Sequence, residues 1–393
     1  MVARTSFPSK YWLFTVVACG ALSTTARADE LDTFQFFAGQ SVQRDSNVFR
    51  LSGATQSDTI GVTTLGVKFD KPLGLQRFEL TADVQDHRYN RNSFLDFTGI
   101  NYAGAWRWSI TPNFRGNLTA DRKEYVDNSP EAQSTSQLNR RTERSTVLDA
   151  EYGIDGPWRL LGGVFNRKYT NSQPSFEGDS ETRGAEAGVR YGFSSGSALS
   201  YRFRQGNGDY SARVALPGFS GSFKEREHEV RYDRALTGKT SLQTRIAHLE
   251  RKHDRIAARD FSGVVGEATV NYAVTAKTSV AGGFARNLGS YQANDASYFQ
   301  ENRVFLAPAW KPTVKTAFRL RYDYGVRRYK GALPGVQATG RRDKTHLAGL
   351  TFEWEPIRAI TLTAFAQRDQ RNSNVPGSDY RASVLGLSAL ARF

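Results

Sequence analysis

The sequence predicts an all-β fold, a transmembrane antiparallel β-barrel of the outer-membrane type with about 18 strands, or sixteen as the next count. Short turns recur about every forty residues. The segments between them alternate apolar and polar side chains with the period of two that a strand requires. Longer polar stretches separate the hairpins on the other side, and this alternation of tight and loose connections is typical of periplasmic turns opposite extracellular loops.

Most of the expected turns contain glycine or proline, whose backbone preferences suit tight reversals. The expected turns are 71–74, 111–113, 155–157, 194–197, 236–239, 275–278, 311–313 and 355–357. The expected strands are 33–44, 58–69, 76–89, 97–110, 114–126, 142–154, 158–169, 182–193, 198–205, 224–233, 240–249, 261–274, 279–286, 301–310, 314–329, 344–354, 358–368 and 379–393. An even number of strands places both termini of the barrel on the same, periplasmic side.

The alternation also decides which face of each strand meets lipid. In residues 76–89, for example, apolar side chains occupy one face, at Phe78, Leu80, Ala82 and Val84. In 314–329, the opposite register would place Arg319 and Arg321 in lipid, at about 2–4 kcal/mol each near the midplane. The apolar face must therefore point outward and the charged face into the lumen.

The first residues predict export from the cytoplasm. Arg4 and Lys10 precede the apolar run 11–22, and a small-x-small pattern ends at Ala28. We expect residues 1–28 to be a signal peptide, cleaved between Ala28 and Asp29, and 29–393 to be a single barrel domain. An uncleaved anchor is the alternative, but the apolar run is shorter than the ~20 residues of a spanning helix.

The net charge and the cysteine content restrict the classes of molecule that the exported chain is expected to bind. The only cysteine, Cys19, lies in the expected signal peptide, where it weakly resembles a lipoprotein cleavage box. Removing residues 1–28 lowers the net charge from +14 to about +11. Such basicity often indicates nucleic acid, which an exported chain does not meet. Outer-membrane lipid, lipopolysaccharide or an acidic polymer is the expected anionic partner instead.

The C-terminal segment supports a barrel over a soluble β-sandwich or propeller. Alternate residues from Leu385 to Phe393 are apolar, and a terminal aromatic resembles the closing strand by which barrel-assembly machinery recognises outer-membrane proteins. Tryptophans lie beside the expected turns, where an interfacial girdle would place them, at Trp108, Trp158, Trp310 and Trp354. The alternative for these tryptophans is core filling.

No catalytic set, metal site or cofactor motif emerges. Residues 192–196 match Gly-x-Ser-x-Gly, but that motif needs a helix where a second strand is expected here. His248, Glu250 and His253 lack the spacing of a zinc motif. We expect no enzyme, although a barrel enzyme that acts on lipid or polysaccharide, and depends on Ser194 or His248, is a third possibility.

The lumen holds the candidate functional residues. The alternation directs a set of arginines inward as pore-lining candidates: Arg77, Arg107, Arg115, Arg159, Arg190, Arg202, Arg204, Arg231, Arg245, Arg319 and Arg321. One interpretation is that inward acidic residues pair with them in ladders across the wall. The other is that excess guanidinium attracts an anionic solute and pairs bidentately with its carboxylates.

Residues 43–51 form the most distinctive short motif, Gln-Arg-Asp-Ser-Asn-Val-Phe-Arg-Leu. It resembles the Tyr-Asp-x-Asn-x-Phe-Arg-Leu segment of outer-membrane β-barrels from exopolysaccharide biosynthesis loci, the exosortase-associated EpsL type within the β-barrel porin 2 family. The matching positions are Asp45, Asn47, Phe49 and Arg50, and Arg44 replaces the usual aromatic. The resemblance implies a role in moving a new exopolysaccharide across the outer membrane, with periplasmic or inner-membrane export components. Alginate exporters, with eighteen strands and a basic lumen, offer an analogy.

These observations predict a passive channel in the outer membrane of a Gram-negative bacterium that exports an acidic polysaccharide. The main alternative is a general porin for small anions.

Overall fold

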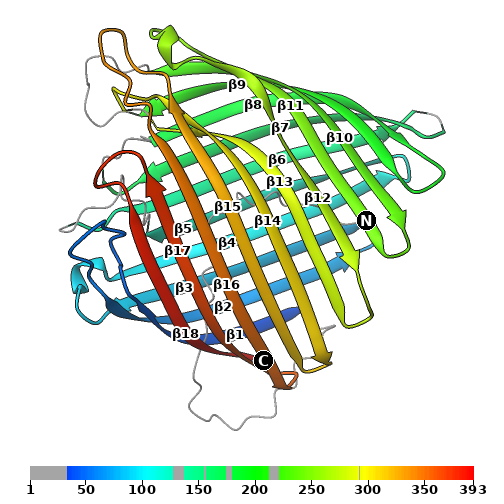
Figure 1. Ribbon diagram of the computed structural model, residues 1–393. Coiled ribbons are helices and arrows are strands. Elements are labelled where there is room, and N and C mark those ends of the chain that lie inside the picture. Colours follow the sequence, from blue (N-terminus) through cyan, green and yellow to red (C-terminus); the bar gives the residue numbers. More distant parts are fainter. Residues whose placement is uncertain (1–32, 127–136, 155, 174–178, 212–220, 292) are drawn as a thin grey trace.

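The computed structural model describes residues 33–126, 137–154, 156–173, 179–211, 221–291 and 293–393. In this part of the chain, 18 strands form one antiparallel sheet in which each strand pairs with its neighbours in sequence (Figure 1). The first strand also pairs with the last, which closes the sheet into a barrel. No helix of the described residues has the length and apolar character needed to cross a membrane. The expected signal peptide, Cys19, and the cleavage site at Ala28 and Asp29 lie outside the described residues.

The strands are β1 (Phe34–Asp45), β2 (Asp58–Leu73), β3 (Gln76–Tyr89), β4 (Phe97–Thr111), β5 (Phe114–Val126), β6 (Arg140–Gly153), β7 (Trp158–Asn171), β8 (Asp179–Gly192), β9 (Ala198–Ser211), β10 (Ser222–Thr237), β11 (Thr240–His253), β12 (Phe261–Ala273), β13 (Thr278–Ser290), β14 (Tyr298–Thr313), β15 (Thr316–Lys330), β16 (Arg342–Ile357), β17 (Ile360–Ser373) and β18 (Tyr380–Arg392). Two short 3-10 helices, η1 (Ser93–Leu95) and η2 (Ala257–Arg259), lie in connections. The predicted count of 18 is confirmed.

The two ends of the barrel differ as expected. Short connections join β2 to β3 and every second pair thereafter, and we call this the turn end. The longer connections, beginning with 46–57 between β1 and β2, define the loop end. In Figure 1 the loop end lies at the upper left and the turn end at the lower right.

The predicted strand boundaries were wrong in two respects. Several strands run further toward the loop end than expected, most clearly β9, which ends at Ser211 and not at 205. Its last outward residues are polar, so the apolar pattern stops before the ladder does. Pro72, Pro312 and Pro356 lie at strand ends and not in the turns themselves. Pro312 and Pro356 fall within register shifts, which spare them a ladder hydrogen bond.

Apolar side chains cover the outward face. Leu65, Leu385 and Leu387 are more than 60% exposed, as residues that contact lipid would be. Near the turn end the outward residues are aromatic and their rings touch, for example Trp158 with Tyr191 at 4.9 Å between centroids. Trp310 similarly stacks on Phe318 at 5.4 Å. This arrangement fits an interfacial girdle and not core filling.

The closing seam involves the C-terminal residue. The Phe36 N–H donates to the Phe393 carbonyl at 2.7 Å, and the Phe393 N–H donates to the Phe36 carbonyl at 2.9 Å. Their rings stack on the outside with centroids 6.4 Å apart. Phe393 therefore helps to close the barrel, and its role as an assembly signal stays a prediction.

Glycines on the inner face make room for aromatic rings. A Cβ on Gly66 would lie 2.1 Å from the Phe37 ring, which crosses from β1 onto β2. Gly208 is related in the same way to Phe223 of β10. These rings lie flat against the wall because the neighbouring strand has no side chain there.

Candidate pore lining

The candidate arginines all lie on the face opposite the exposed apolar residues, which is the inner face of the barrel. Each has a carboxylate oxygen within 4 Å, contributed by a residue on the same face. Each candidate is therefore paired, as the ladder interpretation expects, and the other interpretation, an excess of guanidinium groups, depends on how many arginines share a carboxylate. What distinguishes the arginines is how many share one carboxylate and how exposed they are.

One group, the basic turn-end cluster, joins β2 to β8. It consists of Arg77, Arg107, Arg115, Arg159 and Arg190 with Asp70, Glu79 and Glu151. Arg77 binds Asp70 at 2.7 Å and also approaches Glu79, which accepts a hydrogen bond from Arg107 at 2.8 Å. Guanidinium groups outnumber carboxylates here, so the cluster carries a net positive charge.

Glu151 is the centre of the larger half of this cluster. Arg115 of β5 donates to its Oε1 at 2.5 Å, whereas Arg159 of β7 lies 3.9 Å from the same oxygen. Arg190 of β8 lies 3.7 Å from Oε2. One carboxylate thus faces three guanidiniums from three other strands, and two of these make long contacts that leave donors available to a ligand.

A second group, the β8–β11 ladder, is more buried. Arg204 binds Glu186 at 2.7 Å and Glu227 at 2.9 Å, and Arg245 binds Glu227 at 2.8 Å. The other members are Arg202, Arg231 and Glu229. The Arg204 and Arg245 side chains are 16% and 21% exposed, against 52% for Arg77 and 37% for Arg190. The ladder therefore stabilises the wall, whereas the turn-end cluster is accessible.

The remaining two candidates lie on β15. Arg319 pairs with Glu353 of β16, and Arg321 binds Asp323 of its own strand at 2.6 Å. The Arg321 guanidinium also lies over the Phe305 ring, 4.6 Å from its centroid. Arg321 is thereby fixed against the wall by both contacts.

The connection between β1 and β2 folds back over the inner face. Val48 and Phe49 are almost fully buried against Ile60, Val62 and Tyr89, which point inward from β2 and β3. The fold-back lies at the loop end, because Ile60 and Tyr89 pair near that end of their strands. This segment makes the inner surface of the loop end apolar and bulkier than a bare wall.

The family-like motif is what holds this fold-back in place. The Asn47 amide accepts a hydrogen bond from the Leu51 N–H at 3.0 Å and donates to the carbonyls of Leu51 at 2.8 Å and Arg381 at 3.0 Å. Asp45 accepts the Asn47 N–H at 2.8 Å. The motif residues Asp45, Asn47, Phe49 and Arg50 are all buried, so they form one structural unit.

Arg50 completes that unit. Its guanidinium binds Asp45 at 2.8 Å and lies 3.7 Å from Asp369 of β17. Its φ is 53°, a conformation that favours glycine, so the surrounding contacts must stabilise it. Burial disfavours the charged form, but the Asp45 and Asp369 carboxylates outweigh burial and raise the pKa of Arg50. Arg50 thus remains a cation that links the fold-back to the barrel wall.

The prediction from sequence missed several inward arginines near the loop end that lie over aromatic rings. Arg341 lies 4.3 Å from the Tyr329 centroid, Arg251 4.6 Å from Phe223 and Arg327 5.0 Å from Phe299. Arg327 also binds Glu301 at 2.6 Å. The same period of two would have found Arg327, which occupies an inward position of an expected strand.

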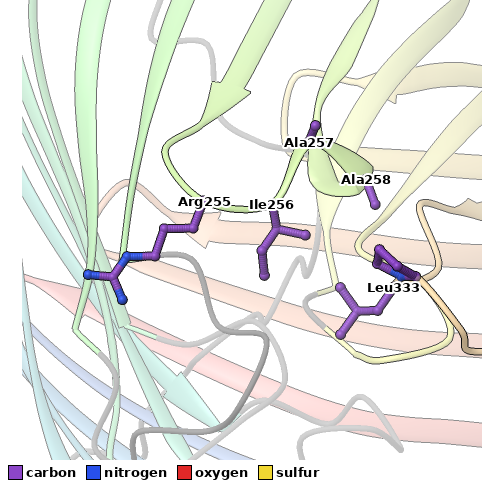
Figure 2. A pocket seen from close by; sticks show the side chains of 6 residues that line it. Arg255, Ile256, Ala257, Ala258 and Leu333 are labelled. Carbon is purple, nitrogen blue, oxygen red and sulfur yellow. The ribbon is translucent and has the colours of Figure 1, made fainter.

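The residues of the enzyme alternative do not come together. Ser194 lies in the turn between β8 and β9, whereas His248 points outward from β11, with Nε2 3.3 Å from the Ser262 hydroxyl. The described residues include no group of side chains suited to hold a metal ion. A hollow of about 370 Å³ at the loop end is lined by Arg255, Ile256, Ala257, Ala258, Leu333 and Pro334 (Figure 2). Its small, mostly apolar lining is separate from the arginines above.

Comparisons with known proteins agree with this architecture. Residues 229–393 match the family model described as "Putative beta-barrel porin 2", which bears out the β-barrel porin 2 part of the resemblance; the comparisons do not test its EpsL type. A search of curated proteins gives no match.

Among solved structures, OccK2 (OpdF) of Pseudomonas aeruginosa is similar at a TM-score of 0.53 and 14% identity, over 92% of this chain and 98% of that one. The same protein in complex with glucuronate has a TM-score of 0.51 at 14% identity, with the same coverage. OpdK of Pseudomonas aeruginosa with vanillate has a TM-score of 0.50 at 12% identity, over 92% and 98% of the two chains. At such identities the similarity shows the fold alone. The chain is an 18-stranded, outer-membrane-type β-barrel of porin-like architecture whose residues 229–393 match the β-barrel porin 2 family.

Proposed function

We propose that this chain is a passive channel in the outer membrane of a Gram-negative bacterium, through which an acidic polysaccharide leaves the cell. In the outer membrane the turn end would face the periplasm and the loop end the outside of the cell, as short turns and long loops do in bacterial barrels. A barrel of 18 strands is wide enough to enclose an aqueous channel. Synthesis of the polymer and the energy for its movement would come from other proteins.

The observation that carries the proposal is the basic turn-end cluster. A polymer that enters from the periplasm would meet this excess of accessible guanidinium groups first. Rings of arginine or lysine favour anions in pores, and field lines focused in a low-dielectric channel raise the local anion concentration. The charge is thus placed where capture of an anionic polymer needs it.

The chemistry of the guanidinium group favours carboxylated sugars. Its planar fork pairs bidentately with a carboxylate, whereas an ammonium group acts as a point charge. A barrel of the same fold has been solved in complex with glucuronate, a uronic acid. Arg159 and Arg190, which contact Glu151 only at 3.9 and 3.7 Å, are the residues we expect to exchange partners with a passing carboxylate.

A deletion strain tests the proposal. Loss of the gene should abolish surface polymer while polymer precursors continue to be made, and normal surface polymer would reject export. Complementation with R115Q/R159Q/R190Q should restore less polymer than the wild-type gene. The matched control is K168Q/R183Q/K252Q, which removes three charges from ion-paired residues on the outer face. Equal restoration by both variants would reject the role of the cluster.

A general porin for small anions is the second candidate. It is favoured by the fold-back of residues 46–51, which fills part of the loop end, and by the small carboxylates in the similar solved barrels. This candidate predicts anion-selective uptake of small solutes and no polymer defect in the deletion strain. The same strain therefore distinguishes the two functions.

The export proposal also requires partners. Barrel-assembly machinery would insert the chain, with Phe393 as part of its recognition strand. Periplasmic or inner-membrane export components would deliver the polymer to the turn end. Co-purification of the tagged full chain with products of neighbouring genes would identify them, and glycosyltransferases encoded beside this gene would favour export over uptake.

A further inference from the structure

A cluster of cations lies on the outer face of the barrel, at the loop-end parts of β15–β18 and β1. We call it the outer basic patch, and it consists of Arg44, Arg328, Lys330, Arg342, Lys344, Arg368 and Arg381. The strand pairing puts all seven on the lipid-facing side, in line with Leu350, Leu385 and Val42. All seven are exposed. A lumenal role is excluded for them because they point away from the channel.

The patch has no internal counter-charge. The outward positions of β1 and β15–β18 carry no acidic residue. Within the described part of the chain none of the seven cations forms an ion pair; Arg368 donates to the Ser383 hydroxyl at 2.7 Å and Arg44 to the Ser57 hydroxyl at 3.3 Å. Arg328 and Arg342 are direct cross-strand partners, an arrangement that repulsion between like charges destabilises.

The opposite side of the barrel shows the contrast. Several outward cations of β5–β8 and β11 form ion pairs with acidic residues on the same face, although Arg144 lies opposite Arg122 and Lys168. Lys168 and Arg183 bind Glu181 at 3.0 and 2.6 Å, and Lys252 binds Glu250 at 3.1 Å. The arc with outward acidic residues thus pairs several of its cations, whereas the outer basic patch has no carboxylate on the outward face of its strands to pair with.

The surface next to the patch is apolar. Toward the turn end, the outward residues of the same strands include Leu320, Leu350, Leu385 and Leu387, which are 46–68% exposed. The Tyr322 hydroxyl lies 2.9 Å from His346 Nδ1 at the boundary between the two zones. A ligand that covers both zones needs several negative charges attached to long apolar chains, which describes a membrane lipid and not a soluble acidic polymer.

We propose that the outer basic patch binds the phosphate groups of lipopolysaccharide, the phosphorylated glycolipid, while its acyl chains pack on the leucines below. The loop end faces the outside of the cell in barrels of this type, so the patch lies at the headgroup level of the outer leaflet. The guanidinium group of arginine forms two parallel hydrogen bonds with a phosphate group. Each cation near an anionic surface strengthens binding about fivefold. The patch supplies enough cations for a bisphosphorylated headgroup.

Lipid binding to the full chain in detergent, followed by native mass spectrometry, tests this. The probes are bisphosphorylated lipid A, monophosphorylated lipid A and phosphatidylglycerol. We expect the bisphosphorylated form to bind most tightly, and R328Q/R342Q/K344Q to weaken it on the order of 100-fold. The control K168Q/R183Q/K252Q should bind within about threefold of wild type, since its cations already have partners. Equal binding of phosphatidylglycerol, or an unchanged affinity of the patch variant, would overturn the proposal.

A single variant guards against a folding defect. R342Q removes the like-charge pair with Arg328, so in lipid-free detergent we expect the barrel to unfold at a temperature equal to or above that of wild type. The same variant should gain less thermal stability than wild type on addition of bisphosphorylated lipid A. An undiminished gain with lipid would show that Arg342 does not bind the headgroup, and a loss of stability without lipid would show that Arg342 has a structural role instead.

Discussion

In the basic turn-end cluster, a substitution of Glu151 and a substitution of Arg190 should have opposite effects on a permeating anion. An anion in contact with the Arg190 guanidinium lies about 4 Å from it and about 8 Å from the Glu151 carboxylate, because these two groups are 3.7 Å apart. Replacing Glu151 with Gln removes a repulsion of about 0.4 kcal/mol at 10 mM salt, from Coulomb's law in water with a Debye length of about 30 Å. Replacing Arg190 with Gln removes an attraction of about 0.9 kcal/mol.

The two variants should therefore shift ion selectivity in opposite directions. E151Q raises the ratio of anion to cation permeability up to about fourfold, because a cation loses what the anion gains. R190Q lowers the ratio up to about 20-fold. Reversal potentials across planar bilayers at low salt measure both. At 1 M salt, where the Debye length is about 3 Å, the effect of E151Q should vanish.

Arg183 supplies the control. It lies on β8, as Arg190 does, but on the outer face, where it binds Glu181 at 2.6 Å. R183Q should leave the reversal potential unchanged. Equal shifts from R183Q and R190Q, or a lower anion preference in E151Q, would refute the assignment of this cluster to the conducting path.

Three further predictions concern the fold-back and the wall. N47A removes three hydrogen bonds of a fully buried amide and should cost about 3 kcal/mol; single-channel conductance should rise as residues 46–51 leave the lumen, and unchanged conductance would count against a constricting role. R50Q leaves Asp45 buried without its cation and should cost about 3–5 kcal/mol, a loss measured by unfolding on heating. G66V should clash with the Phe37 ring and cost about 1–3 kcal/mol; the F37A/G66V double variant should recover stability, and failure to recover would show that the ring is not the obstacle.

The barrel could be predicted from sequence because one physical constraint repeats in every strand. Lipid tolerates apolar side chains alone, so residues such as Leu80 and Leu320 mark the outward face without any tertiary information. Tight turns then fixed the number of hairpins. The prediction missed the loop-end parts of β9 and β11 because their outward residues are polar. In those parts the alternation of apolar and polar residues no longer separates the two faces of the strand.

The candidate site was only partly predictable. The two-residue alternation of side chains along a strand placed Arg77 and Arg190 on the inner face, but it does not predict their partners in neighbouring strands. Glu151 faces Arg159 and Arg190 because of strand register, which depends on turn geometry and bulges such as the one near Pro312. The motif around Asn47 was recognisable in the sequence, but its folding back over the inner face was not, since one of its bonds reaches Arg381 near the end of the chain.

One measurement tests the export channel most directly. The full chain is reconstituted in a planar bilayer, and an acidic uronate oligomer or a neutral oligomer of equal length is added to one side at a time. We predict that the acidic oligomer interrupts the current more often from the turn end than from the loop end, and that R115Q/R159Q/R190Q abolishes this difference. Interruption by the neutral oligomer at the same frequency, or no interruption by either, would contradict capture of an anionic polymer by the basic turn-end cluster.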